Sequence, residues 1–463
     1  MLLPIDTNVF PQKKGVYIVG GSIRDLLCGR TPVDYDLAVA NDPDRFARSL
    51  AARTGGHVVE FGKHGHTVLR VTARDYFFDI LPVNGASIED DLRRRDFTIN
   101  AMALEVSSGN LIDLAGGRLD LVAKKVRMVA RDVFQQDPVR LIRAYRMAAS
   151  FDFTIDRHTE AAISRDADLV RKSAGERIRE ELFKILESKG SHAQLARMAH
   201  SGLLFSVFPE LLQLKNCRLR ANQPANLFEQ TLGAYNHLEK LLDSRDLMLA
   251  ETADRLFEDI DTARATLLKW AVLLQNLGQP AARTVTADGA LHFCGHAANS
   301  AAMAREICRK LRFSKRQTDT IEFMIRHHLR PFFLFNARQK KVPADRAFIR
   351  FFMRCGDCTP DILLLALAGY MGQRALQEPS PQSFAEFVTE GLNTYYSILR
   401  PRALQPPPLN GNDLITNFGL KPSAAFKRIL KTIEEEHLAR EKFTRKEALK
   451  MVGKMINGTK VQI

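Results

Sequence analysis

Two short segments near the N-terminus combine glycines and charged side chains in a spacing that suits phosphate chemistry. Residues 20–25 read Gly-Gly-Ser-Ile-Arg-Asp and follow a β-rich run at residues 16–19. A strand, two glycines and a helix start present backbone N–H groups to an anion. Asp34 and Asp36 lie two residues apart, so on a strand both carboxylates point to one face. Oxygen ligands beside a phosphate site favour Mg²⁺, which takes one or two carboxylates and completes its shell with substrate phosphates and water.

A third group of charged residues lies at residues 91–101, which read Asp-Leu-Arg-Arg-Arg-Asp-Phe-Thr-Ile-Asn-Ala. A run of arginines is often a solvated surface, but here a segment with buried character follows at once. Guanidinium groups grip phosphate oxygens in a fork geometry, which assigns Arg94 and Arg95 to a triphosphate. Asp96 and Asn100 can hydrogen-bond a ribose. With the paired carboxylates, these residues predict an in-line attack on a nucleoside triphosphate.

A fourth group pairs a carboxylate with a guanidinium. Asp137 and Pro138 look like a helix start, and Arg140 then falls at i+3 from Asp137 on one helix face. An acceptor beside a donor matches the edge of adenine or cytosine, which offers an amino donor next to a ring-nitrogen acceptor. An intrahelical salt bridge is the alternative that this pair alone leaves open. Arg143 follows one turn further.

The elements that position these residues change type along the chain. Residues 1–115 read as strands interleaved with short helices. From about residue 131 to 400 the apolar pattern is helical. Prolines between residues 401 and 408 mark a linker, and a small basic helical segment follows. The sequence therefore predicts an α+β chain whose charged motifs lie mainly in its N-terminal part.

Charge points to a polyanionic partner. The chain has 463 residues, with 67 Lys and Arg against 53 Asp and Glu, a net charge of +14. Two stretches, residues 305–330 and 421–463, hold most of this excess. No run of 18 apolar residues occurs, and the N-terminus lacks the pattern of a signal peptide. We therefore expect a cytoplasmic protein.

Together these motifs resemble the class II template-independent nucleotidyltransferases. That family comprises bacterial tRNA nucleotidyltransferases, namely the CCA-, CC- and A-adding enzymes, and bacterial poly(A) polymerases. Its motifs occur here in the family's order. The matching segments are residues 20–25, 34–36, 94–101, 113–121, 136–140 and 176–182.

The resemblance implies a four-part architecture within the α+β class. A nucleotidyltransferase head of the polymerase-beta-like α/β type would occupy residues 1–150, and an all-α neck residues 151–220. A degenerate HD-like helical body would occupy residues 221–400, and a basic helical tail residues 401–463.

The resemblance also implies a reaction, the transfer of AMP, or of CMP and AMP, from the triphosphate to an RNA 3′-hydroxyl, with tRNA as the expected acceptor. Asp34 and Asp36 would be the catalytic pair and would hold the Mg²⁺ cofactor. The partners would be ATP or CTP and an RNA 3′ end, with no DNA and no membrane. The nucleotide-binding residues would be Gly20, Gly21, Ser22, Arg24, Arg94, Arg95, Asp96, Asn100, Asp137, Arg140 and Arg143.

Two departures from the family pattern bear on the nucleotide. Gln136 stands where the family usually has Glu. Only residues 82–90 separate the preceding strand from the arginine motif, whereas CCA-adding members carry a longer loop there, so we expect ATP as the substrate. A poly(A) polymerase, which shares every motif, is the alternative within the class. The alternative from another class is an RNA-binding protein with a relic site.

Residues 220–400 resemble an HD phosphohydrolase-like domain that lacks its defining ligands. Gln275-Asn276 stands where the His-Asp pair belongs, and Gln230 stands at the upstream His. His296, His327 and His328 remain, without carboxylates. Amides are poor ligands for a hydrolytic metal, so we expect a scaffold that extends the RNA-binding surface.

Overall fold

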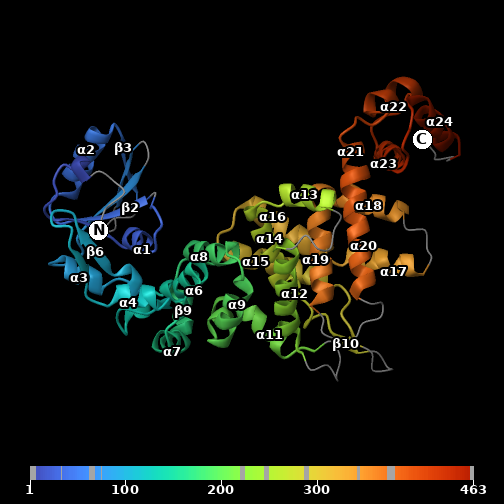
Figure 1. Cartoon of the computed structure of the whole chain (residues 1–463). Coiled ribbons are helices and arrows are strands. Elements are labelled where there is room, and N and C mark those ends of the chain that lie inside the picture. The colour runs from blue at the N-terminus through green and yellow to red at the C-terminus, as the bar shows by residue number, and fades with distance from the viewer. Residues whose placement is uncertain are drawn as a thin grey trace. The chain divides into compact units, whose positions relative to one another are not determined.

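The computed structural model describes two compact units, Met1–Phe208 and Pro209–Ile463 (Figure 1). The main sheet lies in the first unit and the second is almost entirely helical, so the α+β class is confirmed. The expected head and most of the neck fall in the first unit; the boundaries at 150, 220 and 400 stay a prediction. The described residues are 7–32, 34–61, 68–73, 76–218, 225–243, 250–285, 291–340, 345–372 and 381–458.

A seven-stranded sheet of the order β3-β4-β5-β2-β1-β6-β7 forms the base of the head. β2 and β5 run parallel, and the other neighbours run antiparallel. Alternate residues of a strand face the interior, and Val16 and Ile18 of β1 are fully buried. The strands are β1 (Val16–Val19), β2 (Asp34–Val39), β3 (His57–Phe61), β4 (Val68–Thr72), β5 (Phe77–Pro82), β6 (Met102–Glu105) and β7 (Leu111–Asp113).

Helices α1 (Gly21–Leu27) and α2 (Pro43–Thr54) bury apolar side chains in the same core as the sheet. Ile23 and Phe46 are buried there. The end of β1 lies opposite Asp36 of the antiparallel β2. The turn from β1 into α1 is therefore brought next to the first residues of β2.

The remaining helices of the first unit form the rest of the head and the neck. One boundary differs from the sequence prediction: Asp137 is extended, and α6 begins only at Arg140. The Arg140 N–H still donates to the Asp137 carbonyl oxygen, at 3.1 Å. These helices are α3 (Ile88–Arg93), α4 (Gly117–Val122), α5 (Val133–Gln136), α6 (Arg140–Phe151), α7 (Arg157–Asp166), α8 (Gly175–Glu187), α9 (Ser191–His200) and α10 (Leu203–Val207).

In the second unit the helix α19 (Thr359–Met371) is apolar on all sides and buried along nearly its whole length, as expected of a core helix. The other main body helices are α12 (Leu227–Asp243), α13 (Ala250–Asp259), α14 (Thr262–Leu274), α15 (His296–Lys310), α16 (Lys315–His327), α17 (Arg330–Gln339), α18 (Asp345–Cys355) and α20 (Pro381–Thr394).

A separate small core holds the C-terminal helices together. Leu414, Ile433 and Val452 are buried in it. Its helices are α22 (Gly411–Phe418), α23 (Ala424–Ala439) and α24 (Arg445–Gly458). None of the helices that the structure describes is long and apolar enough to cross a membrane.

Candidate active site

The turn between β1 and α1 depends on glycine. Gly20 has a φ of 66°, in the left-handed region that disfavours side chains. A Cβ atom at this position would lie 2.7 Å from Nη1 of Arg95 and 3.2 Å from Oδ2 of Asp36. Glycine therefore allows a guanidinium and a carboxylate to approach the turn together.

Ser22 and Gly21 fix the first residues of β2 against this turn. The Ser22 hydroxyl accepts a hydrogen bond from the Asp36 backbone N–H at 2.8 Å and donates to the Asp34 carbonyl oxygen at 3.3 Å. The Gly21 backbone N–H donates to the Asp36 carboxylate. The buried Ser22 hydroxyl thus serves the fold, and the Asp34–Asp36 segment is held at the edge of the pocket.

The surroundings of the Asp36 carboxylate disfavour its ionised form. Burial raises its pKa to about 6, and the neighbouring Asp79 adds to the rise, against the lowering effects of Arg95, Gly21 and Arg24. Asp79 lies beside Asp36 because β5 pairs in parallel with β2. A cation at this edge would relieve the repulsion between the carboxylates.

Magnesium fits this donor set. Among the described residues no group of three or more histidine, cysteine, aspartate or glutamate side chains is arranged to hold a metal ion by itself. Mg²⁺ takes one or two carboxylates and is completed by substrate phosphates and water. Asp34 and Asp36 supply two carboxylates next to the glycine turn, and this meets that requirement.

Arg24 and Asn100 join α1 to the arginine motif. Nη1 of Arg24 donates to Oδ1 of Asn100 at 2.7 Å, and Nη2 donates to Asp25 at 2.8 Å. The Asn100 amide in turn donates to Asp96 at 3.0 Å. The Arg24 guanidinium also lies over the Phe151 ring, 4.4 Å from its centre. These contacts hold the Arg24 guanidinium in one orientation at the pocket.

Next to these hydrogen bonds lies a carboxylate–guanidinium network of four residues, Asp96, Arg143, Arg146 and Glu181. Arg143 donates to Asp96 at 3.2 Å and to Glu181 at 3.0 Å, and Arg146 donates to the other Glu181 oxygen. Burial works to raise the pKa of Asp96, but Arg143, the Asn100 amide, the Phe97 N–H and Arg140 outweigh it and lower the pKa. Asp96 is therefore ionised at neutral pH although it is buried.

Asp137 and Arg140 meet, but each also has a protein partner. The Asp137 carboxylate accepts two hydrogen bonds from Arg177 of α8, at 2.8 and 3.0 Å. Nε of Arg140 is 3.8 Å from Asp137 and is buried without a hydrogen-bond partner. Nη2 of Arg140 donates to the Arg94 carbonyl oxygen at 3.0 Å. One donor of this pair is thus left for a further acceptor.

These side chains surround an open pocket of about 530 Å³. Eleven of the residues predicted from the sequence line it, and Arg94 and Asp137 are outside its lining. The Arg94 guanidinium turns away to Asn84, at 3.2 Å. The sequence prediction omitted four lining residues, Asp25, Asp79, Arg146 and Lys184. Asp25 stood in the first motif, and Lys184 follows the neck motif, so both had a local signal.

Comparison with known proteins agrees with this geometry. The family model for the poly(A) polymerase head domain matches residues 16–127, and a model described as a probable RNA and SrmB-binding site of polymerase A matches residues 152–214. The A-adding tRNA nucleotidyltransferase of Deinococcus radiodurans is 30% identical over 449 residues, 95% of each chain. The chain belongs to the class II tRNA nucleotidyltransferase and poly(A) polymerase family.

Other members of this family match over a similar length. The CC-adding tRNA nucleotidyltransferase of Thermus thermophilus is 29% identical over 95% of this chain and 93% of that protein. The solved structure of a CCA-adding enzyme with ATP aligns with a TM-score of 0.64 at 22% identity, covering 97% of this chain and 91% of that chain. The shared fold thus extends through the body and tail.

Four polar residues of the second unit lie where the HD site was expected. We call them the body cluster: Asn276, Gln279, His296 and His328. The Gln279 amide donates to Asn276 at 3.1 Å and lies 3.4 Å from Nε2 of His296. The His296 and His328 rings are 5.6 Å apart. Burial lowers the pKa of both imidazoles, that of His328 to about 4.

The body cluster is therefore neutral at pH 7. Nδ1 of His296 and of His328 each faces a backbone carbonyl, at 2.8 and 2.6 Å, so that nitrogen carries the proton. Buried side-chain oxygens of Gln230, Gln275 and Gln279 have no hydrogen-bond partner. The inference that this region is a scaffold without hydrolytic activity stays a prediction.

Proposed function

We propose that this chain transfers AMP from ATP to the 3′-hydroxyl of tRNA. The observation that carries the proposal is the glycine turn at Gly20 beside Asp34 and Asp36, with Arg95 directed at the same turn. The full-length match to a relative named as an A-adding tRNA nucleotidyltransferase supports it.

The reaction assigns a task to each part of the pocket. The 3′-oxygen forms a bond to the α-phosphorus, the bond from that phosphorus to the bridging oxygen breaks, and pyrophosphate leaves while the hydroxyl proton is released. Arg24 and Arg95 offer guanidinium groups to the triphosphate. Asn100 and Asp96 orient Arg24 through the hydrogen bonds described above.

Asp34 and Asp36 would hold the magnesium ion. When bound, Mg²⁺ supplies positive charge to the phosphates and to the attacking oxygen. The role of the two carboxylates is to place that charge at the edge of the sheet, beside the Gly20 turn. Asp79 lies next to Asp36 in the parallel register, but its carboxylate is already paired with Arg70, at 2.6 Å.

Asp137 and Arg140 would select the base. The Arg140 guanidinium lines the pocket and the Asp137 carboxylate lies 3.8 Å from its Nε, so the pair would offer a donor and an acceptor to an adenine or cytosine edge. The link from the end of β5 at Pro82 to the start of α3 at Ile88 is short, which favours ATP over successive CTP and ATP. The relatives include both A-adding and CC-adding proteins, so the nucleotide must be measured.

The test uses purified protein with tRNA ending at the discriminator base, at C or at CC, and ATP or CTP supplied singly. We expect one AMP to be added to the CC-ended tRNA and little CMP to any of the three. Robust CMP addition to the shortest tRNA would contradict the choice of ATP. Continued growth of a long tail on unrelated RNA would instead identify a poly(A) polymerase.

A further inference from the structure

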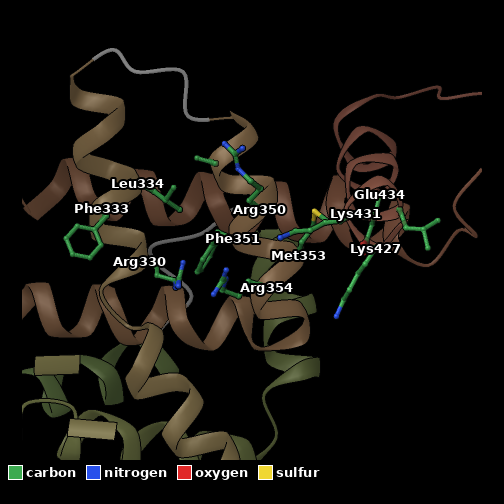
Figure 2. Close-up of a pocket in the computed structure, with 12 residues that line it drawn as sticks. Arg330, Phe333, Leu334, Arg350, Phe351, Met353, Arg354, Lys427, Lys431 and Glu434 are labelled. Atoms are coloured by element: carbon green, nitrogen blue, oxygen red, sulfur yellow. The ribbon is translucent and has the colours of Figure 1, made fainter. Parts of the chain in front are cut away.

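A second pocket, of about 800 Å³, lies among α17, α18 and α23. Every residue that lines it belongs to the second unit, so it is distinct from the candidate active site. Figure 2 shows side chains of all three helices around it, with Lys431 extending from α23 toward Met353 of α18. Nothing in the proposed reaction uses this pocket.

Each helix presents one face to the pocket. Lining residues on α18 recur at 347, 350, 351 and 354, and those on α23 at 427, 430, 431 and 434. Spacings of three and four residues place side chains on a single face of a helix. The pocket is therefore built from two facing helix stripes rather than from scattered surface residues.

Cations dominate these faces. Arg350 and Arg354 lie one turn apart on α18, Lys427 and Lys431 lie one turn apart on α23, and Arg330 is a fifth cation from α17. Like charges at i and i+4 destabilise a helix. Two such pairs that line one pocket give it a positive potential, which favours an anionic ligand.

The protein itself supplies little of that opposing charge. Glu434 is the single carboxylate in the lining. Among the described residues no carboxylate lies within ion-pairing distance of Arg354, Lys427 or Lys431. Arg350 is 3.7 Å from Glu435.

Neighbouring groups report the same excess of positive charge. Arg330 donates through Nε to His327 at 3.0 Å, not to an acid. Burial lowers the pKa of His327 to about 4, and the nearby Arg330, Arg354 and Arg326 contribute to that lowering. The region between α16 and α18 is thus already crowded with cations, which disfavours any additional protonation.

The same pocket offers apolar contact. Phe333 is 62% exposed, an unusual degree for so large an apolar ring, and it lines the pocket with the buried Phe351 and with Leu430. An aromatic face next to guanidinium groups suits a planar base carried by a phosphorylated group.

We propose that this pocket is a second site for a nucleoside polyphosphate, separate from the nucleotide site of the reaction. Its volume falls in the range of pockets that enclose small molecules. A polyphosphate concentrates several negative charges on one small group, which matches five cations in one cavity. An RNA strand spaces its charges one per nucleotide, so fewer of them would fit within a pocket of this size than the adjacent charges of a polyphosphate. The bound polyphosphate would bridge α23 to α17 and α18.

The first measurement is the number of ATP molecules bound per full-length chain by titration calorimetry, repeated with inorganic tripolyphosphate. We expect two ATP sites in the unmodified protein. Replacing Asp137 and Arg140 by alanine removes the reaction site and leaves one. If the proposed function were wrong and this proposal right, the single remaining site would be present with or without that change.

Charge reversal then locates the second site. The variant carrying Arg354→Glu and Lys431→Glu should bind ATP at least tenfold more weakly at that site, with the other site unaffected. Lys446→Glu with Lys450→Glu, exposed residues of α24 outside the pocket, is the matched control and should leave both sites intact. The milder pair Arg354→Gln and Lys431→Gln covers the case in which charge reversal unfolds the tail.

Two results would overturn the proposal. One is a single ATP site in the unmodified protein that the Asp137 and Arg140 change abolishes. The other is ATP binding that neither Arg354 nor Lys431 affects. If no second ATP site exists and the pocket variant weakens RNA binding more than the control variant does, the pocket serves an RNA strand instead.

Discussion

The carboxylate–guanidinium network of the head and the body cluster are both buried groups of polar side chains, but their charges differ. The network keeps the buried Asp96 ionised, and Arg143 lies between the carboxylates of Asp96 and Glu181. The body cluster contains amides and imidazoles, and burial keeps its imidazoles neutral. A buried charge is tolerated only when it is paired, whereas a neutral cluster needs hydrogen bonds alone.

The difference indicates which region is equipped to meet a charged substrate. In the head, paired charges border an open pocket that is lined by both carboxylates and guanidinium groups. In the body, the donors point to backbone carbonyls and to neighbouring amides, and buried oxygens of Gln230 and Gln275 have no partner. We therefore expect nucleotide transfer in the first arrangement and a purely structural role for the second.

The largest effect should come from Asp36→Asn. This change keeps the shape of the side chain but removes the charge that would hold Mg²⁺, and AMP incorporation should fall by roughly 10²–10³-fold or more. Gln279→Ala in the body cluster is the control, with AMP incorporation per folded protein within about twofold of the original. Transfer of labelled AMP to CC-ended tRNA measures both.

The opposite result would reverse the assignment. If the unmodified protein transferred no AMP and Asp36→Asn left every cellular effect unchanged, the head would be a relic and the protein an RNA-binding one. If a phosphatase activity survived in Asp36→Asn and was lost in His296→Ala, the body cluster would be the reacting site.

The two regions should also differ in their response to acid. His328 titrates near pH 6.5 when unfolded but has a pKa of about 4 in the fold, chiefly because of burial. The unfolded chain therefore binds more protons between these values, and the body loses stability as the pH falls from about 6.5 to 4, by about 3 kcal/mol for His328. Asp96 and Asp137 have lowered pKa values, so their contribution is lost only below about pH 4.

Hydrogen exchange followed by mass spectrometry measures this loss of stability, with rates corrected for the pH dependence of the intrinsic exchange reaction. Between pH 7 and 5, protection in α16 should fall while protection in α6 is kept. His328→Gln should reduce the response of α16, and the remaining response should come from His327, whose pKa is also lowered to about 4. Equal loss of protection in both helices would contradict the difference in charge state.

The sequence predicted the local parts of the head site well. The glycine turn, the Asp34–Asp36 pair and the arginine motif are each formed by a few consecutive residues, and all contribute to one pocket. Their residue types carry the chemistry directly. The loss of the His-Asp pair in the body was equally local, because Gln275-Asn276 is visible in the sequence.

What the sequence could not supply depends on contacts between distant segments. Asp79 occupies an otherwise apolar strand, and only the parallel pairing of β5 with β2 brings it beside Asp36. Asp137 was expected at the start of a helix, but it is extended, the helix begins at Arg140, and Asp137 is held by Arg177, forty residues further along the chain. The local pattern of apolar residues predicts neither of these contacts.

A smaller effect is expected from Arg177→Ala. Removing two hydrogen bonds to a charged group leaves the Asp137 carboxylate free to turn, which should lower kcat/KM for ATP by roughly tenfold and reduce the preference for ATP over GTP. Arg171→Ala, an exposed neck arginine outside the pocket, is the control. A loss of activity with unchanged nucleotide preference would show that Arg177 stabilises the neck and does not position Asp137.

The smallest effect concerns charges that the two buried clusters do not use. In the stretch 305–330, Arg305, Arg309 and Arg326 are paired with carboxylates. In contrast, no ion pair is found among the described residues for Lys446 and Lys450. Replacing both lysines by alanine should weaken tRNA binding several-fold and reduce the slope of log affinity against log salt by about 0.7–0.9 for each phosphate that the tail no longer neutralises. Arg309→Ala should change tRNA affinity and its salt dependence less, because Glu306 already neutralises the charge of Arg309. ATP affinity should be unchanged in both variants, so an equal loss of ATP binding would mean that tail charge and head chemistry are coupled.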